Sequence, residues 1–199
     1  MATKKSQRIV IWVISIVMLV GTIGGFVAMM IDPGGEMRQK AESDRQMAEW
    51  QKQIEQAAKE RAESSEPLEG YEASKFDAST ISELKTEILV QGEGDELEGN
   101  STILANYFGW TSDGSIFDST NQGGTQEPVQ FSLEEVIEGW TIGLTGIRVG
   151  SVVRLTIPSN QAYGEAGSPP NIGANEPLQF IVEVREKVVG AQWNRLLKN

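Results

Sequence analysis

The N-terminal part of the chain contains one long apolar run that carries no charge. The run covers residues 9–31 and would form a helix of roughly 35 Å at about 1.5 Å per residue, enough to cross a bilayer core of about 30 Å. Lys4, Lys5 and Arg8 precede it, whereas acidic and basic residues are mixed after it. Because positive charge favours the cytoplasmic side, we expect residues 1–8 to be cytoplasmic, the run to be a transmembrane helix and the rest of this single-pass membrane protein to be extracytoplasmic.

A cleaved signal peptide is the alternative interpretation of the same run. The apolar region of a signal peptide is usually about 7–15 residues long and ends in a small-x-small cleavage site. The run in this chain has 23 residues and ends in Met29-Met30-Ile31-Asp32, which is a poor cleavage site. Both features favour a retained membrane anchor.

The segment 36–63 has the composition of a helical stalk. It contains neither Pro nor Gly and is rich in Ala, Glu, Gln, Lys and Arg, which all favour a helix. A 3-4-3 spacing gives it one apolar stripe, formed by Met47, Trp50, Ile54 and Ala57. Asp44 interrupts the stripe one turn earlier, so only about two heptads are clean. Two readings stay open: a solvated stalk helix, or a short coiled coil that dimerises the chain.

The pattern changes again after this helix. Residues 64–82 are polar and form a predicted linker, and residues 83–188 contain short runs of Val, Ile, Leu and Phe bounded by turn residues. The predicted strands are Thr86–Gln91, Thr102–Thr111, Val129–Leu133, Val152–Ile157 and Leu178–Val184. Ser132, as an N-cap, and Glu135, as its capping-box partner, predict one short helix over Leu133–Gly139. The expected fold is an α+β domain with an antiparallel sheet, followed by a tail over residues 189–199.

Composition removes several kinds of chemistry. The chain has no His and no Cys, which excludes thiol and Ser-His-Asp catalysis, disulfides and Cys/His zinc sites. Its net charge of −11 argues against a nucleic-acid partner. Asp113 and Asp118 lie on either side of Gly114, but the surrounding sequence does not follow the calcium-loop pattern. We therefore predict an Asp-Gly turn there and no metal site.

Four blocks of sequence, in a fixed order, carry the functional signal. They are Tyr107-Phe-Gly-Trp with Asp113-Gly114-Ser-Ile-Phe117-Asp118, then Glu135-Val136-Ile137-Glu138-Gly139-Trp140, then Leu155-Thr-Ile-Pro158 with Ala162-Tyr163-Gly164, and finally Pro177-Leu178-Gln-Phe180. Together these blocks resemble FKBP-type peptidyl-prolyl isomerases over roughly residues 84–186. The resemblance implies an antiparallel half-barrel of five or six strands around one short helix.

The resemblance also implies which side chains form the site. Trp140 would be the floor of an apolar pocket, and its walls would be Tyr107, Phe117 and Phe180. The substrate-binding residues would further include Val129, Glu135, Val136, Ile137 and Ile172. The residues expected to act in catalysis are Tyr107, Phe117, Asp118, Trp140 and Tyr163.

The implied function is isomerisation of X-Pro bonds in extracytoplasmic proteins, in a dry aromatic pocket and without a cofactor or metal. The implied partners are proline-containing polypeptides and macrolide inhibitors of the tacrolimus and rapamycin type, and the domain is expected to be monomeric. Val129 and Ser168 stand where the family often has an aromatic residue and a His, which bears on substrate preference. The alternative is a membrane-anchored peptide-binding or chaperone module with little or no isomerase activity.

Overall fold

The computed structural model describes residues 36–188 of the chain. The predicted anchor over residues 9–31 and the predicted C-terminal tail lie outside this range. Among the helices that the structure describes, none combines the length and the apolar character needed to span a membrane. The chain divides into two compact units, Met1–Gln56 and Ala57–Asn199.

Helix α2, Glu36–Ser64, agrees with the predicted stalk helix. In the first unit its described side chains are exposed except for Ile54, which is half-buried, and Met47 and Trp50 keep 59% and 40% of their full accessible surface. Nothing in the described part of this unit tests whether the stripe pairs with a second helix, so the coiled coil stays a prediction. The last two turns of the helix, from Ala57 on, belong to the second unit.

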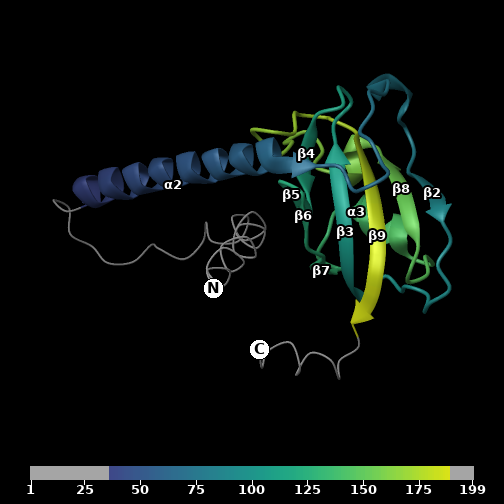
Figure 1. Cartoon of the computed structure of the whole chain (residues 1–199). Coiled ribbons are helices and arrows are strands. Elements are labelled where there is room, and N and C mark those ends of the chain that lie inside the picture. Colours follow the sequence, from purple (N-terminus) through teal and green to yellow (C-terminus); the bar gives the residue numbers. More distant parts are fainter. Residues whose placement is uncertain (1–35, 189–199) are drawn as a thin grey trace. The chain divides into compact units, whose positions relative to one another are not determined.

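The second unit is built on a six-stranded antiparallel sheet (Figure 1). The strand order is β2-β8-β9-β3-β4, and β7 also pairs with β3. The strands are β2 (Lys85–Val90), β3 (Thr102–Trp110), β4 (Ile116–Ser119), β7 (Val129–Ser132), β8 (Val152–Ile157) and β9 (Leu178–Val188). A small second sheet has the order β1-β5-β6, formed by Ser65–Glu66, Asn121–Gln122 and Thr125–Gln126. Helix α3, Glu138–Leu144, and two short 3-10 helices, Ala78–Thr80 and Ser159–Gln161, complete the described elements of this unit.

The turn between β3 and β4 has the form that its sequence predicts. Gly114 has φ +86°, a backbone conformation that glycine adopts without steric cost. The Asp113 carboxylate accepts hydrogen bonds from the Thr111 hydroxyl and the Ser115 amide at 2.7 and 2.9 Å. Asp113 is thus a turn residue, and its hydrogen bonds to Thr111 and Ser115 lower its pKa.

The sheet buries a different apolar cluster on each face. Alternate residues of β3 divide between them, with Ile103, Ala105 and Tyr107 on the face that also holds helix α3, and Phe108 and Trp110 on the other. Successive side chains of a strand point to opposite faces, so this strand is buried on both. The functional residues considered below belong to the face that carries α3.

The segment predicted as a linker is packed against the opposite face of the sheet. Leu68 is only 3% exposed and joins the cluster of Phe108 and Trp110. The indole Nε1 of Trp110 donates to the Ser74 carbonyl at 2.9 Å, and the Phe76 amide donates to the Ser112 carbonyl at 3.0 Å. Residues 65–76 are therefore an integral layer of the second unit and not a free connection.

The short helix begins later than its sequence predicts. Helix α3 covers Glu138–Leu144, whereas the capping box predicts Leu133–Gly139. Ser132 does not cap it; its carbonyl accepts from the Glu135 amide within a turn. Packing decides the position, because Trp140 and Leu144, four residues apart, bury the same face of α3.

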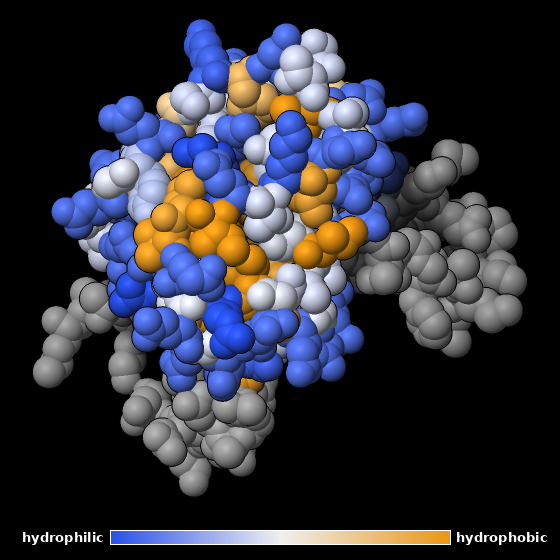
Figure 2. Space-filling view, turned by 90° about the vertical axis from the view of Figure 1, so that its right-hand side faces the viewer, coloured by the Kyte–Doolittle hydropathy of each residue, from blue (hydrophilic) through white to orange (hydrophobic). Residues whose placement is uncertain are grey.

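Exposed apolar side chains lie at the edge of the sheet that β2 forms. Figure 2 views the side on which Figure 1 shows β2 and β8, and an apolar patch is visible there among hydrophilic residues. On the edge strand β2, Ile88 and Val90 are each almost half exposed. Since β2 and β4 are the two ends of the strand order, this patch is separate from the polar cluster at β4 described below.

Candidate active site

Five aromatic rings from five different elements form one cluster on the α3 face of the sheet. Trp140 lies edge to face with Tyr107, Phe131 and Phe180, with ring centroids 5.4, 5.3 and 5.4 Å apart. Phe117 lies edge to face with Phe180 at 5.5 Å, and Tyr107 with Phe131 at 5.4 Å. Such perpendicular contacts are favourable between rings, whose faces are negative and edges positive. The arrangement can exclude water from whatever lies against it.

Trp140 occupies the centre of this ring cluster. It is 4% exposed, and its indole Nε1–H has no hydrogen-bond partner among the residues that the structure describes. Two glycines of α3, Gly139 and Gly143, allow the helix to approach Ile157 and Leu155 of β8 closely, because a Cβ atom at either glycine would lie within 2.8 Å of those side chains. Close packing of α3 on the sheet thus sets the position of the indole.

The structure brings together most of the residues that the sequence predicts for the site. Those buried in the same apolar cluster are Tyr107, Phe117, Trp140, Ile172 and Phe180, and Val136 and Ile137 pack against it. Val129 is half-buried on β7, two residues before Phe131 and so on the same side of the strand. Glu135 is an exposed residue of the turn before α3. Tyr163 follows the second 3-10 helix and is 36% exposed, outside the ring cluster.

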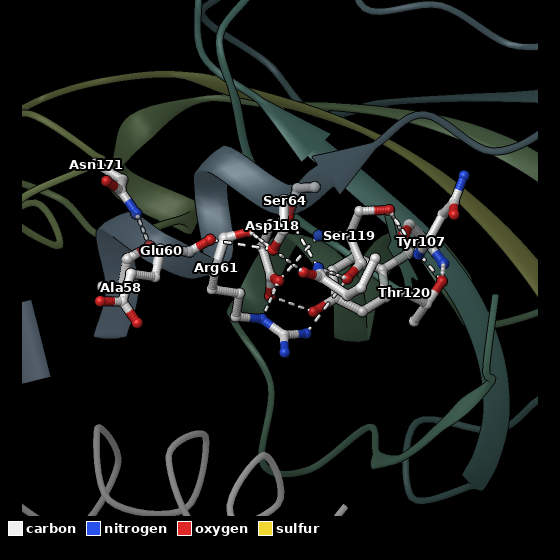
Figure 3. Close-up of polar contacts among 12 residues, drawn as sticks. Ala58, Glu60, Arg61, Ser64, Tyr107, Asp118, Ser119, Thr120 and Asn171 are labelled. Atoms are coloured by element: carbon white, nitrogen blue, oxygen red, sulfur yellow. Dashed lines mark hydrogen bonds and ion pairs between the residues drawn. The ribbon is translucent and has the colours of Figure 1, made fainter. Parts of the chain in front are cut away.

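Asp118 organises the polar end of the cluster (Figure 3). The Tyr107 hydroxyl donates to Asp118 Oδ2. Asp118 Oδ1 accepts from the guanidinium Nε of Arg61 at 2.5 Å and from the Ser119 amide at 2.9 Å. Arg61 Nη2 also donates to the Ser119 carbonyl at 3.3 Å. Both carboxylate oxygens are therefore held by directed donors.

The ionisable groups around Asp118 have shifted pKa values. Burial raises the pKa of the Tyr107 phenol well above its usual value, and the negative charge of Asp118 adds to the shift. Burial also raises the pKa of Tyr163, and the negative charge of Asp118 makes a smaller contribution in the same direction. For Arg61, burial is the largest single influence and lowers the pKa, but the charges and hydrogen bonds of Asp118 and Tyr107 together outweigh it, so the net shift is upward. Both phenols are neutral and Arg61 is charged at neutral pH.

The directions of these pKa shifts predict how the expected isomerase activity depends on pH. Because both phenol pKa values lie above about 10 and the chain has no His, no group with such a shift titrates between pH 6 and 8. We expect kcat/KM for an X-Pro peptide to change less than twofold over this range. The measurement is kcat/KM in buffers of constant ionic strength. A steep change of kcat/KM with pH in the folded protein would contradict this expectation.

Gly109 is needed where β3 passes beneath two of the rings. A Cβ atom at this position would lie 2.5 Å from the Phe180 ring and 2.6 Å from the Phe117 ring. Overpacking of this kind typically costs about 1–3 kcal/mol. We expect Gly109→Ala to lower the free energy of unfolding by that amount in urea denaturation, whereas Gly173→Ala, at an exposed position where a Cβ atom would meet nothing within 4 Å, should leave it nearly unchanged. Unchanged stability of Gly109→Ala would show that the rings can move aside.

Two residues of the site are absent from the sequence prediction. Phe131 has a local signal, since it alternates with Val129 along a predicted strand. Arg61 has none, because it lies 57 positions before Asp118 in a segment that reads as an independent helix. Among residues 36–188, no three or more acidic side chains are grouped as metal ligands.

The fold and the ring cluster define a class of protein: an antiparallel sheet that holds a cluster of aromatic rings against one short helix. Residues 94–185 match the family model described as FKBP-type peptidyl-prolyl cis-trans isomerase. The domain built around these residues is therefore of the FKBP-type peptidyl-prolyl cis-trans isomerase family.

Several named proteins are similar to this chain. The chain is 35% identical over 137 residues to a probable FKBP-type peptidyl-prolyl cis-trans isomerase of Haemophilus influenzae, covering 64% of this chain and 56% of the relative. It is 36% identical over 128 residues to FkpA of Escherichia coli K12, covering 64% and 46%. A solved peptidyl-prolyl cis-trans isomerase from Pseudomonas syringae pv. tomato is 34% identical, with a TM-score of 0.49 and coverage of 53% of this chain and 76% of that one. The chain thus spans about half the length of the curated relatives that it matches.

Proposed function

We propose that this chain catalyses cis-trans isomerisation of X-Pro bonds in polypeptides. The observation that carries the proposal is the buried ring cluster of Tyr107, Phe117, Trp140 and Phe180, with Asp118 hydrogen-bonded to Tyr107 at its polar end. Membership of the FKBP-type family supports it. The site offers an apolar surface and neutral or paired hydrogen-bonding groups, which suits a reaction in which no proton is transferred.

An apolar pocket can accelerate this reaction by excluding water. Rotation about the X-Pro bond breaks amide resonance, so the twisted state has a less polar carbonyl than the planar state. Water stabilises the planar state more, and a dry pocket therefore binds the twisted state preferentially. The uncatalysed barrier is roughly 18–20 kcal/mol. A reduction of about 5 kcal/mol would accelerate the reaction several thousandfold.

The residues divide into two roles in this mechanism. Trp140 would support the proline ring, while Tyr107, Phe117 and Phe180 would exclude water around it. The Ile137 N–H and the Glu135 carbonyl would bind the peptide backbone, and the Tyr163 hydroxyl would donate to a substrate carbonyl. Val136 and Ile137 are apolar, so we expect a preference for apolar residues before proline.

We further propose that the domain works outside the cytoplasm, attached to the membrane by residues 9–31. The support is in the sequence: an uncharged run long enough to cross a bilayer, with Lys4, Lys5 and Arg8 before it. Substrates would then be proteins that fold after export.

The activity is tested with the full chain in detergent. A proline-containing peptide whose cis and trans forms are cleaved at different rates by a protease reports the isomerisation rate. We expect an acceleration proportional to protein concentration, and its loss in a variant with Phe117→Leu and Trp140→Leu. Peptide binding without acceleration of isomerisation would overturn the proposed isomerase activity and favour the alternative, a peptide-binding or chaperone module.

The topology is tested by protease accessibility. Protease added to intact cells, or to spheroplasts where a second membrane intervenes, should digest the domain and spare a cytoplasmic control protein. A domain that is protected until lysis would overturn the extracytoplasmic placement and leave the isomerase proposal unaffected.

A further inference from the structure

The end of helix α2 contacts the candidate active site from outside the matched family region. Arg61 pairs with Asp118 on β4, and three residues earlier in the helix the Ala58 carbonyl accepts from the Asn171 side chain at 3.0 Å (Figure 3). Asn171 directly precedes Ile172, which is buried in the same apolar cluster as the rings. One helical turn thus contacts two segments of the site that are more than 50 residues apart in the chain.

We propose that Arg61 is a positioning residue for the isomerase site, acting through Asp118 on Tyr107. The inference rests on the proposed function for its effect on rate, but the contact itself does not. Arg61 is not expected to touch the reacting bond. Its role is to hold the carboxylate that in turn holds the phenol of a pocket wall.

The charge distribution around Asp118 makes Arg61 the relevant cation. From Ser119 to Leu133 the chain contains no Lys or Arg, so the hairpin that follows Asp118 supplies no positive charge of its own. The side chains of Arg61 and Asp118 are 18% and 22% exposed, which shields the pair partly from water and salt. Placing a carboxylate at this depth is costly unless it is paired and hydrogen-bonded.

The geometry of the contact suits arginine better than lysine. Nε binds Asp118 Oδ1 while Nη2 reaches the Ser119 carbonyl, so the planar guanidinium spans two successive residues of β4. A lysine ammonium is a single point charge and cannot reproduce that fork. The fork orients Asp118 so that its other oxygen, Oδ2, receives the Tyr107 hydroxyl.

Several contacts fix the helix end so that Arg61 is already in place before substrate binds. Strand β1 directly follows α2 and pairs with β5, with Ser65 opposite Gln122 and Glu66 opposite Asn121. The Ser119 hydroxyl donates to the Glu66 carbonyl at 2.6 Å. These bonds tie the residues after Arg61 to the residues after Asp118 and so keep the two members of the ion pair close together.

The kinetic test uses the full chain with Arg61→Met, Arg61→Lys and the control Arg45→Met. Arg45 is an exposed residue of the same helix in the first unit, so its replacement makes the same change in charge and composition. We expect Arg61→Met to lower kcat/KM about tenfold, mainly through kcat, because a charge-assisted hydrogen bond is lost. Arg61→Lys should recover part of the loss, and Arg45→Met should stay within about twofold of wild type.

A double-mutant cycle asks whether Arg61 acts through Asp118. In an Asp118→Asn background, Arg61→Met should cost little more, since the carboxylate that it positions is already absent. Losses that simply multiply would overturn the inference. An Arg61→Met variant as active as wild type, or more active, would also overturn it, and increased activity would mean that the ion pair blocks the site instead.

A spectroscopic measurement separates failure of this inference from failure of the proposed function. In the isotope-labelled full chain, Arg61→Met should shift the ring resonances of Tyr107, whereas Arg45→Met should not. Unshifted Tyr107 resonances would overturn the positioning role whether or not the chain is active. If the wild-type chain has no isomerase activity but Arg61→Met still shifts the Tyr107 resonances, the positioning role is supported and only the proposed reaction is overturned.

Discussion

Replacing Phe117 with alanine should lower kcat/KM for an X-Pro peptide by about a hundredfold, equivalent to about 3 kcal/mol of transition-state stabilisation. Phe117 is almost fully buried and lies edge to face with Phe180, so removing its ring opens a wall of the pocket to water. If exclusion of water supplies most of the rate, this loss should exceed the loss of any one hydrogen bond.

The matched comparison is Tyr163→Phe, which removes one hydroxyl and keeps the ring. One neutral hydrogen bond contributes about 0.5–1.5 kcal/mol, so this variant should lose roughly two- to twelvefold in kcat/KM. Phe117→Leu, which preserves more of the buried volume, guards against an alanine variant that fails to fold, and should fall between the two. Circular dichroism checks the fold. A folded Phe117→Ala variant with nearly full activity would overturn the desolvation mechanism even though the family assignment stands.

The second large effect concerns where the domain begins. A chain that starts at Glu69 should lose at least about 5 °C of thermal stability and more than tenfold in kcat/KM, relative to a chain that starts at Lys52. The shorter chain lacks strand β1, the buried Leu68 and Arg61, although it contains all of the matched family region. Burial of a leucine side chain alone is worth about 1.5–3 kcal/mol.

Two measurements separate the contributions to this effect. Thermal unfolding of both truncated chains reports the lost packing of Leu68 and β1, while kcat/KM reports the lost contact with Asp118. A third chain that starts at Lys52 and carries Leu68→Ala should lose stability but keep most of its activity. Equal stability and activity of the chains that start at Lys52 and Glu69 would mean that residues 52–68 do not contribute to the domain.

The sheet was largely predictable because its signals are local. Strand β8 was predicted at the residues where it is found, and β3 within one residue, since runs of β-branched and aromatic residues end at turn residues. The turn at Asp113-Gly114 was predicted for the same reason. Strand β9 extends four residues beyond its predicted end at Val184, because pairing with β3 continues to Val188.

The candidate site was predictable only in part. The family resemblance indicated Tyr107, Phe117, Trp140 and Phe180, which the structure places in one ring cluster. The start of the short helix was wrong, because the capping signal at Ser132 is weaker than the packing of Trp140 against three rings. Local propensities of this kind are routinely overridden by tertiary contacts.

By itself, the sequence determined five of the six strands of the main sheet, missing β4, together with the stalk helix, the absence of His and Cys from the chemistry, and the family to which the domain belongs. Only the tertiary structure decided that residues 65–76 pack on the sheet and that Arg61 pairs with Asp118. The physical reason is the same in both cases. A solvated helix or linker and a packed one have similar local composition, and the difference lies in which distant surface covers them: for Leu68 the face of Phe108 and Trp110, and for Arg61 a carboxylate 57 residues further along the chain.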